Sequence, residues 1–314
     1  MKSSKKIAFL FPGQGAQYVG MGKSFYDAFA IFRQTIEEGC DLLSFDLKKV
    51  IFEGPENVLT TTKHSQPAIF LISLATLKVL QEQFPSLQPC VCAGLSLGEY
   101  SALVASKKLN FQDALFLVQK RAIWMSEACE KSPGSMSAVI GLDPNDVQQV
   151  IASLNPPHKV WVANYNCPGQ IVISGTKEGL QIATEKLKLK GARKLLPLKV
   201  GGAFHSGLML YAQEKLTEAI SAVQLLKSDI DIVMNTPGDY VKDEKEIKSF
   251  LIKQVTQSVY WQKSIETMEE ENVQTFIEIG PGKTLTNMNK KIQIKGSSYF
   301  VDKAQDLDNL AEIQ

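Results

Sequence analysis

The stretch CVCAGLSLGEYSALVAS occupies residues 90–106 and carries the clearest fold signal in the chain. Its first part, Cys90 to Leu95, is a short apolar run typical of a buried strand, and a helix is predicted from about Leu97 to Ser106. The pattern GxSxG at residues 94–98 lies where the strand gives way to the helix. In such a turn, small residues let the backbone fold sharply and the serine hydroxyl is exposed. The stretch therefore predicts a strand–turn–helix unit with Ser96 at its turn.

Strand-like and helix-like segments alternate on both sides of this unit. A strand is predicted at 6–11, helices at 68–83 and 111–130, and further strand, turn and helix patterns at 231–235 and 273–292. Such alternation is typical of α/β proteins with a largely parallel sheet. We therefore expect a hydrolase-like α/β core.

The rhythm changes between these segments. Strands are predicted at 135–141, 159–165, 170–174 and 193–199, and helices at 144–154 and 177–190. The resulting β-α-β-β-α-β order is the split pattern of a ferredoxin-like unit. The unit is small for an independent domain, which favours an insertion in the larger core. We predict a large α/β catalytic subdomain from residues 1–131 and 200–314, and a small ferredoxin-like subdomain from residues 132–199.

Composition and charge exclude several classes of protein. The 314 residues are 44% hydrophobic and 21% charged, as in globular chains, and the net charge of +1 offers no broad attraction for nucleic acid or an anionic membrane. The five scattered cysteines contain no CxxC pair, which fits free thiols in a reducing compartment. The apolar runs at 7–11 and 68–77 are too short for a signal-peptide core and a membrane span. We expect a cytoplasmic protein that recognises its partner through a specific site.

Ser96 needs a base if it is a nucleophile, and histidine is the usual base near neutral pH. Of the three histidines, His64 and His158 lie in polar or loop-like surroundings, whereas His205 follows a strand in the sequence GGAFHS. Between Ser96 and His205 no acidic residue lies on a convincing strand-end loop. A backbone carbonyl could orient the imidazole in place of an acid.

Arg121 indicates the kind of substrate. It shares a helix face with apolar residues, where a guanidinium is costly unless it binds an anion or its stem reaches water. The second explanation is the better one for an isolated arginine. Close to a nucleophilic serine, a guanidinium that can bind a carboxylate with two nitrogens favours an acidic acyl group.

Three other patterns resemble binding motifs but lack an essential residue. The loop FPGQGAQ at 11–17 has Tyr18 where a dinucleotide fingerprint requires glycine, and GPGKT at 280–284 has Ile277 where a P-loop requires glycine. Cys90 and Cys92 have no nearby histidine, so buried thiols are favoured over metal ligands. The first loop could instead direct backbone N–H groups, including that of Gln14, at a reacting oxygen.

Several separated motifs, in the same order, resemble those of malonyl-CoA:acyl-carrier-protein transacylases. They are FPGQGAQ at 11–17, GLSLGEYSAL at 94–103, QKRAIWM at 119–125, NYNCPGQIVISG at 164–175, GAFHS at 202–206, Gln254 and IEIGPGKTL at 277–285. The resemblance implies an acyltransferase of fatty-acid biosynthesis. Malonyl-CoA and acyl carrier protein would be its partners, and it would need neither cofactor nor metal.

The resemblance also implies a role for each matching residue. Ser96 would be the nucleophile, His205 the base and Arg121 the ligand of the malonyl carboxylate. The N–H groups of Gln14 and Leu97 would form the oxyanion hole. The carbonyl of Gln254 would hold the histidine, and Asn164 and Asn166 would support the site. The chain departs from the common family pattern at Gly207, where many members have proline, and at Cys167, where many have serine.

Two other functions compete with this interpretation. An esterase or thioesterase of the GxSxG type would deliver the acyl group to water, but the missing acid and the presence of Arg121 argue against it. A noncatalytic module that docks carrier protein would form no acyl-enzyme on Ser96.

Overall fold

A six-stranded sheet forms the centre of the molecule. The computed structural model describes residues 6–313, and the strand order is β10-β9-β1-β2-β7-β8. Neighbouring strands are parallel except for the pair β7 and β8. Because the carboxyl ends of parallel strands meet at one edge, the loops after β1 and β2 lie together there. The strands are β1 (Lys6–Phe11), β2 (Val91–Gly94), β7 (Asp231–Met234), β8 (Asp239–Tyr240), β9 (Val273–Ile279) and β10 (Ser297–Val301).

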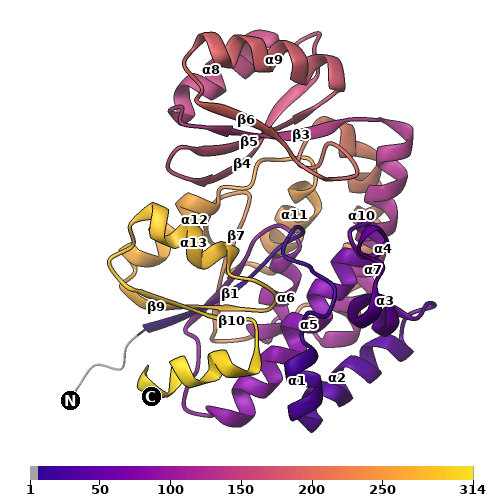
Figure 1. Cartoon of the computed structure of the whole chain (residues 1–314), viewed down its shortest axis with the longest axis vertical. Helices are drawn as coiled ribbons and strands as arrows, with labels where there is room; N and C mark the ends of the chain where they lie inside the picture. The colour runs from indigo at the N-terminus through magenta and orange to yellow at the C-terminus, as the bar shows by residue number, and fades with distance from the viewer. Residues whose placement is uncertain (1–5, 314) are drawn as a thin grey trace.

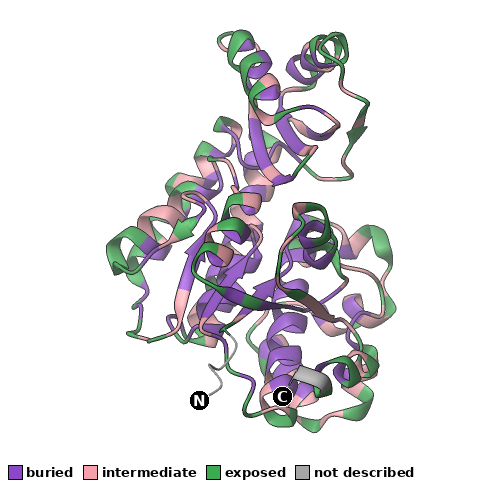
Figure 2. Cartoon of the chain, turned by 90° about the vertical axis from the view of Figure 1, so that its left-hand side faces the viewer, coloured by how far each residue is buried: buried purple, intermediate pink, exposed green. Residues whose placement is uncertain are grey.

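Helices cover the central sheet and complete its core (Figure 1). The long helix α5 is buried along most of its length and packs against α7 and α2. Figure 2 shows the buried residues concentrated in the sheet strands and on the inward faces of the helices. The helices outside the small sheet are α1 (Lys23–Ala28), α2 (Ala30–Asp41), α3 (Leu47–Glu53), α4 (Glu56–Leu59), α5 (Thr62–Gln83), α6 (Gly98–Ala105), α7 (Phe111–Lys131), α10 (Leu210–Ala222), α11 (Glu244–Gln254), α12 (Trp261–Glu270) and α13 (Thr284–Ile292), with short 3-10 helices at Gly207–Met209 and Ala304–Ile313. No helix in the described part of the chain is long and apolar enough to cross a membrane.

The predicted start of the helix at 68–83 is wrong, because α5 begins six residues earlier, at Thr62. Proline is disfavoured inside helices, and the prediction therefore began after Pro67. In the structure Ser65, Gln66 and Pro67 are all buried. Burial of this first part of the helix against the protein interior outweighs the single backbone hydrogen bond that Pro67 cannot donate.

A second, antiparallel sheet has the order β4-β5-β3-β6. Its elements are β3 (Ser135–Ile140), α8 (Pro144–Leu154), β4 (Val160–Cys167), β5 (Gln170–Gly175), α9 (Lys177–Leu189) and β6 (Lys194–Pro197). Helices α8 and α9 cover the outer face of this sheet, and the opposite face is turned toward the core (Figure 1). The predicted fold class, a mostly parallel α/β core with a ferredoxin-like insertion, is confirmed. The predicted division at residues 131/132 and 199/200 stays a prediction, and its outer limits, residues 1 and 314, lie outside the described residues.

The two sheets are joined by hydrogen bonds between β4 and the segment that follows α11. The N–H of Val259 donates to the carbonyl of Ala163 at 2.8 Å, and the N–H of Tyr165 donates to the carbonyl of Val259 at 2.9 Å. Asn164 and Val259 thus form an isolated parallel bridge. This seam lies five residues after Gln254.

Candidate active site

Ser96 lies in a tight turn between β2 and α6, as predicted. Its φ of 53° is in the left-handed region, which a side chain rarely adopts. The two glycines of the motif allow the close approach of backbone segments. A Cβ on Gly98 would lie 2.1 Å from the carbonyl oxygen of Phe11, and one on Gly94 would lie 2.0 Å from the backbone of Gly98. The turn therefore holds the serine at the carboxyl edge of the central sheet.

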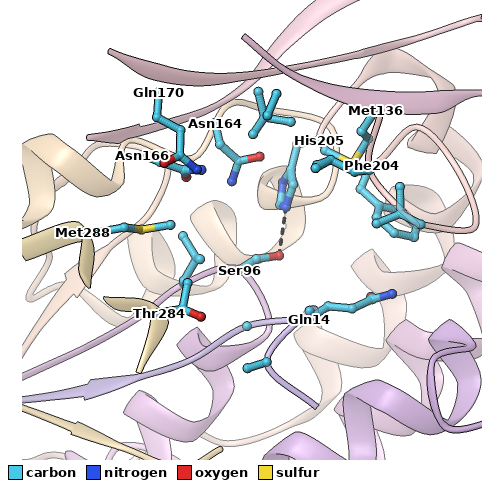
Figure 3. Close-up of a pocket in the computed structure, with 18 of the residues that line it drawn as sticks. Gln14, Ser96, Met136, Asn164, Asn166, Gln170, Phe204, His205, Thr284 and Met288 are labelled. Carbon is cyan, nitrogen blue, oxygen red and sulfur yellow. Dashed lines mark hydrogen bonds between the residues drawn. The ribbon is translucent and has the colours of Figure 1, made fainter. Parts of the chain in front are cut away.

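His205 contacts the serine directly (Figure 3). Its Nε2 lies 2.8 Å from Ser96 Oγ, and its Nδ1 lies 2.8 Å from the carbonyl oxygen of Gln254. Because a carbonyl only accepts, Nδ1 carries the proton and Nε2 is free to accept one from the serine. A main-chain carbonyl thus orients the imidazole where many hydrolases use an acid.

The surroundings of His205 keep its ring neutral. Burial, together with the nearby positive charge of Arg121, lowers its pKa to about 4. Its side chain is almost fully enclosed, with only 3% of the residue exposed. At neutral pH the imidazole is therefore unprotonated and available as a base.

Arg121 reaches the same serine from α7. One guanidinium nitrogen, Nη2, donates to Ser96 Oγ at 3.0 Å and to Gln254 Oε1 at 2.9 Å, and Nη1 donates to Gln66 Oε1 at 2.7 Å. The residue is only 1% exposed, so the alternative that its stem carries the charge to water is wrong. No carboxylate among residues 6–313 lies within ion-pair distance of it. Its charge is thus available to an anion that enters the site.

The two predicted oxyanion donors, Gln14 and Leu97, come from the loop after β1 and from the turn that holds the serine. Gln14 is in the loop after β1 and lines the cavity, and Leu97 is the residue directly before α6. Within the described chain, neither backbone N–H has a hydrogen-bond acceptor. The N–H of Ser96 itself is occupied, because it donates to Asn235 Oδ1 at 2.6 Å. Gln14 and Leu97 therefore offer free N–H groups beside the hydroxyl.

The small sheet forms the opposite wall of the cavity, which has a volume of about 260 Å3. Asn164 and Asn166 from β4 lie on this wall (Figure 3). Neither side chain hydrogen-bonds to His205 within the described chain, and the ring is held by the carbonyl of Gln254. The other small-sheet residues of the wall are Met136, Ala138, Gln170 and Val172.

Three polar residues of the site were missed by the sequence analysis: Gln66, Glu99 and Asn235. Glu99 is in the first turn of α6 and is fully buried, and burial raises its pKa to about 7 in spite of its hydrogen bonds to Asn235 and Gln254. Its position three residues after Ser96, inside the motif GLSLGEYSAL, was a usable signal. Asn235 directly follows β7, at a strand end where functional groups gather in such sheets. Gln66 had no signal, because its contact with Arg121 joins two distant helices.

Gly207, where the chain departs from the family pattern, lies directly beneath an aromatic side chain. A Cβ at this position would lie 2.7 Å from the ring of Trp161 on β4. The adjacent Ser206 Oγ donates to the carbonyl of Ala203 and accepts from the N–H of Leu208. The loop behind His205 is thus packed against the small sheet at the place where the glycine leaves room.

Comparison with known proteins agrees with this geometry. The family model of the acyl transferase domain matches residues 8–299. The malonyl CoA-acyl carrier protein transacylase of Bacillus subtilis is 43% identical over 304 residues, covering 96% of this chain and 95% of the relative. The protein of the same name from Haemophilus influenzae is 37% identical over 92% of both chains.

Solved structures give the same result. The malonyl-CoA:acyl-carrier-protein transacylase structure from Streptococcus pneumoniae has a TM-score of 0.92 and 40% identity, covering 98% of this chain and 100% of that one. A malonyl-transacylase in complex with a type II polyketide synthase acyl-carrier protein has a TM-score of 0.94 and 34% identity, with coverage of 98% and 100%. The resemblance seen in the sequence motifs is confirmed. The chain therefore belongs to the acyl transferase domain family, among the malonyl CoA-acyl carrier protein transacylases.

Proposed function

We propose that this protein transfers a malonyl group from coenzyme A to the phosphopantetheine thiol of acyl carrier protein, in fatty-acid biosynthesis. The observation that carries the proposal is the meeting of Ser96, His205 and Arg121 in one cavity. A neutral base on the serine and a buried, unpaired guanidinium beside it are what the transfer of an anionic acyl group requires. The sequence and structure of its relatives support the same activity.

In the first half-reaction Ser96 Oγ attacks the thioester carbonyl of malonyl-CoA, and His205 Nε2 accepts the serine proton. The carbonyl oxygen becomes an oxyanion, which the free N–H groups of Gln14 and Leu97 can stabilise. The carbon–sulfur bond then breaks, and the coenzyme A thiolate takes the proton from His205. The product is a malonyl ester of Ser96.

The second half-reaction reverses these steps with a different thiol. His205 removes the proton from the phosphopantetheine thiol, and the thiolate attacks the serine ester. When the carbon–oxygen bond breaks, Ser96 Oγ recovers its proton from His205. Two similar thiol–ester exchanges thus replace one direct transfer, in a ping-pong sequence.

Arg121 selects the acyl group. Its Nη2 is within hydrogen-bond reach of the serine hydroxyl, which brings the guanidinium close enough for a carboxylate on the ester-bound acyl group to bind it. Such charge-assisted bonds contribute about 1.5–3 kcal/mol, which favours malonyl over acetyl groups.

A cytoplasmic location is also part of the proposal. All five cysteines are free in the structure, although Cys90 and Cys92 lie close together in sequence. Free thiols persist where glutathione and thioredoxin keep them reduced.

Intact-mass measurement tests the function directly. The enzyme is mixed briefly with malonyl-CoA and then with acyl carrier protein. We expect a malonyl adduct on the enzyme that disappears as malonyl carrier protein forms. Free malonate as the main product would identify a thioesterase, and the absence of any adduct would identify a carrier-docking module.

A further inference from the structure

A fully buried carboxylate beside the nucleophile takes no part in the steps above. Glu99 lies in the first turn of α6, three residues after Ser96. Its Oε1 accepts the backbone N–H of Asn235 at 2.6 Å, and its Oε2 accepts Nε2 of Gln254 at 2.6 Å. An ionised carboxylate only accepts hydrogen bonds, so both neighbours must present donors to it. Glu99 therefore determines the orientation of the groups around it.

The first of these groups is the amide of Gln254. Its Nε2 donates both to Glu99 and to the carbonyl of Ser96, the latter at 2.9 Å. The oxygen end of the amide consequently faces Arg121 and accepts from its Nη2. If the amide were reversed, its oxygen would face the oxygens of Glu99 and Ser96, which cannot donate. Its nitrogen would face Nη2 of Arg121, which cannot accept. Glu99 thus fixes which end of Gln254 meets the guanidinium.

This arrangement keeps Arg121 available for a substrate. Its guanidinium is held by the neutral amide oxygens of Gln66 and Gln254. A carboxylate in direct contact would occupy the nitrogens that a malonyl carboxylate needs. With Gln254 between them, Glu99 polarises the amide and strengthens its bond to Arg121 without neutralising the arginine.

The second group that Glu99 orients is the nucleophile turn. Glu99 holds the backbone N–H of Asn235, whose side chain accepts the N–H of Ser96 and donates to the carbonyl of Gly94, both at 2.6 Å. Through Gln254 it also reaches the carbonyl of Ser96. Both peptide groups of the serine are therefore tied to Glu99, and such ties can hold a left-handed backbone that a serine rarely adopts.

We propose that Glu99 is a positioning residue for malonyl selection, because it orients Gln254 and Asn235 so that Arg121 and Ser96 meet a carboxylate-bearing acyl group together. The inference rests on the proposed function and adds to it the origin of the preference for malonyl. It predicts that Glu99 contributes to discrimination between acyl groups, and not to stability alone.

The test compares Glu99→Gln with a matched control, Glu278→Gln. Glu278 is also fully buried and also accepts two hydrogen bonds, from the N–H groups of Leu285 and Thr286, but it does not line the cavity and, within the described chain, has no hydrogen bond to Ser96, Arg121 or Gln254. Acyl-enzyme formation is measured by single-turnover intact mass with malonyl-CoA and with acetyl-CoA. In Glu99→Gln the new amide keeps its oxygen on the N–H of Asn235 and points its nitrogen at Nε2 of Gln254. Two donors then face each other, so the amide of Gln254 must rotate.

For Glu99→Gln we expect the malonyl rate to fall by roughly tenfold to a hundredfold and the malonyl preference over acetyl to fall by about tenfold. For Glu278→Gln we expect an unchanged preference for malonyl over acetyl, even if the substitution lowers the melting temperature. Equal losses with both acyl groups in Glu99→Gln, or the same change in both variants, would overturn the inference. The wild-type enzyme is measured before any variant. If it forms no malonyl adduct, the proposed function itself is refuted.

A second variant keeps the test decisive if Glu99→Gln does not fold. Gln254→Met removes the amide but retains the main-chain carbonyl that holds His205. We expect it to lose malonyl preference by about tenfold while acetyl transfer continues. An unchanged preference would show that the chain from Glu99 through Gln254 to Arg121 has no role in selection.

Discussion

The two sheets contribute to the cavity in different ways. The central parallel sheet and its helices supply the serine, its base, the guanidinium and the free N–H groups, through Ser96, His205, Arg121, Gln14 and Leu97. The small antiparallel sheet supplies the opposite wall, with apolar side chains and the amides of Asn164 and Asn166. None of its residues hydrogen-bonds to Ser96 or His205 within the described chain.

The groups that react and the wall that encloses the substrate therefore come from different parts of the fold. The reacting groups are fixed by buried hydrogen bonds, most of which lead back to Gln254. The wall residues have polar atoms that remain free, such as Oδ1 of Asn166. Substitutions in the two regions should therefore have effects of different kinds and sizes.

The largest effect is expected for Ser96→Ala in the central region. Loss of the nucleophile should lower transfer by about 10⁴-fold or more and abolish the mass adduct. Ser101→Ala is the matched control, because Ser101 is a buried serine on α6, the helix that follows Ser96, and its hydroxyl has no partner in the described chain. Full transfer by Ser96→Ala would reject the nucleophile assignment.

Arg121→Ala should have the next largest effect. Without the guanidinium, malonyl transfer should fall by roughly tenfold to a hundredfold more than acetyl transfer. Steady-state kinetics with both CoA esters measures the difference, and Arg33→Ala serves as control because Arg33 donates to main-chain carbonyls in the last turn of α1. Equal losses for both esters would remove the carboxylate role.

A wall substitution should have a smaller effect of a different kind. In Asn166→Ala we expect KM for malonyl-CoA to rise by no more than about tenfold, the value of one hydrogen bond, with little change in the acylation rate at saturation. Asn145→Ala, on the exposed first turn of α8, is the control. If Asn166→Ala were acylated as slowly as Ser96→Ala, the small sheet would take part in the acylation step, and the distinction between the two regions would be wrong.

The smallest effect is expected from the titration of His205 between pH 8 and pH 5. An ordinary histidine, with a pKa of 6.5, would be mostly protonated and inactive at pH 5. Because the pKa of His205 is lowered to about 4, its neutral form persists, and protonation of this residue should slow acylation only as the pH approaches 4. Protonation of Glu99, whose pKa is raised to about 7, should lower the malonyl rate at a higher pH, and only in wild type. Single-turnover rates are measured between pH 4.5 and 8 in wild type and in Glu99→Gln. This substitution removes a second titratable group of the site, one whose pKa lies in this range.

An acid limb centred near pH 6.5 in both proteins would contradict the effect of burial on His205. A limb near 7 that is present only in wild type would belong to Glu99, whose pKa burial raises to about 7.

Much of this architecture could be predicted from the sequence. Regular alternation placed β1, β2, α7 and the six elements of the small sheet within a few residues of their observed bounds. In the segment between Tyr18 and Thr61 no helix was predicted. Its helices are short, and of α1 to α4 only α3 has a side-chain cap. Helices α2, α3 and α4 pack against α5, and α1 packs against α2, contacts that local sequence does not record.

The site was predictable where chemistry is local. Ser96 was marked by its turn, and His205 and Arg121 by residue type and surroundings. Glu99 and Asn235 had a usable signal of place in the sequence, but their contacts and those of Gln66 could not be predicted, because each bond joins residues distant in sequence or depends on the orientation of an amide. The group that orients His205 could not be identified from the residues themselves, because it is a main-chain carbonyl and every residue has one.

The seam between the sheets has a mechanical consequence. Val259 is bonded to β4, and the same short segment begins at Gln254, whose carbonyl orients His205. A tilt of the small sheet large enough to open the cavity mouth would pull on this segment and hence on the support of the imidazole. The position of the small sheet and the orientation of the imidazole are therefore linked through the short backbone segment from Gln254 to Val259.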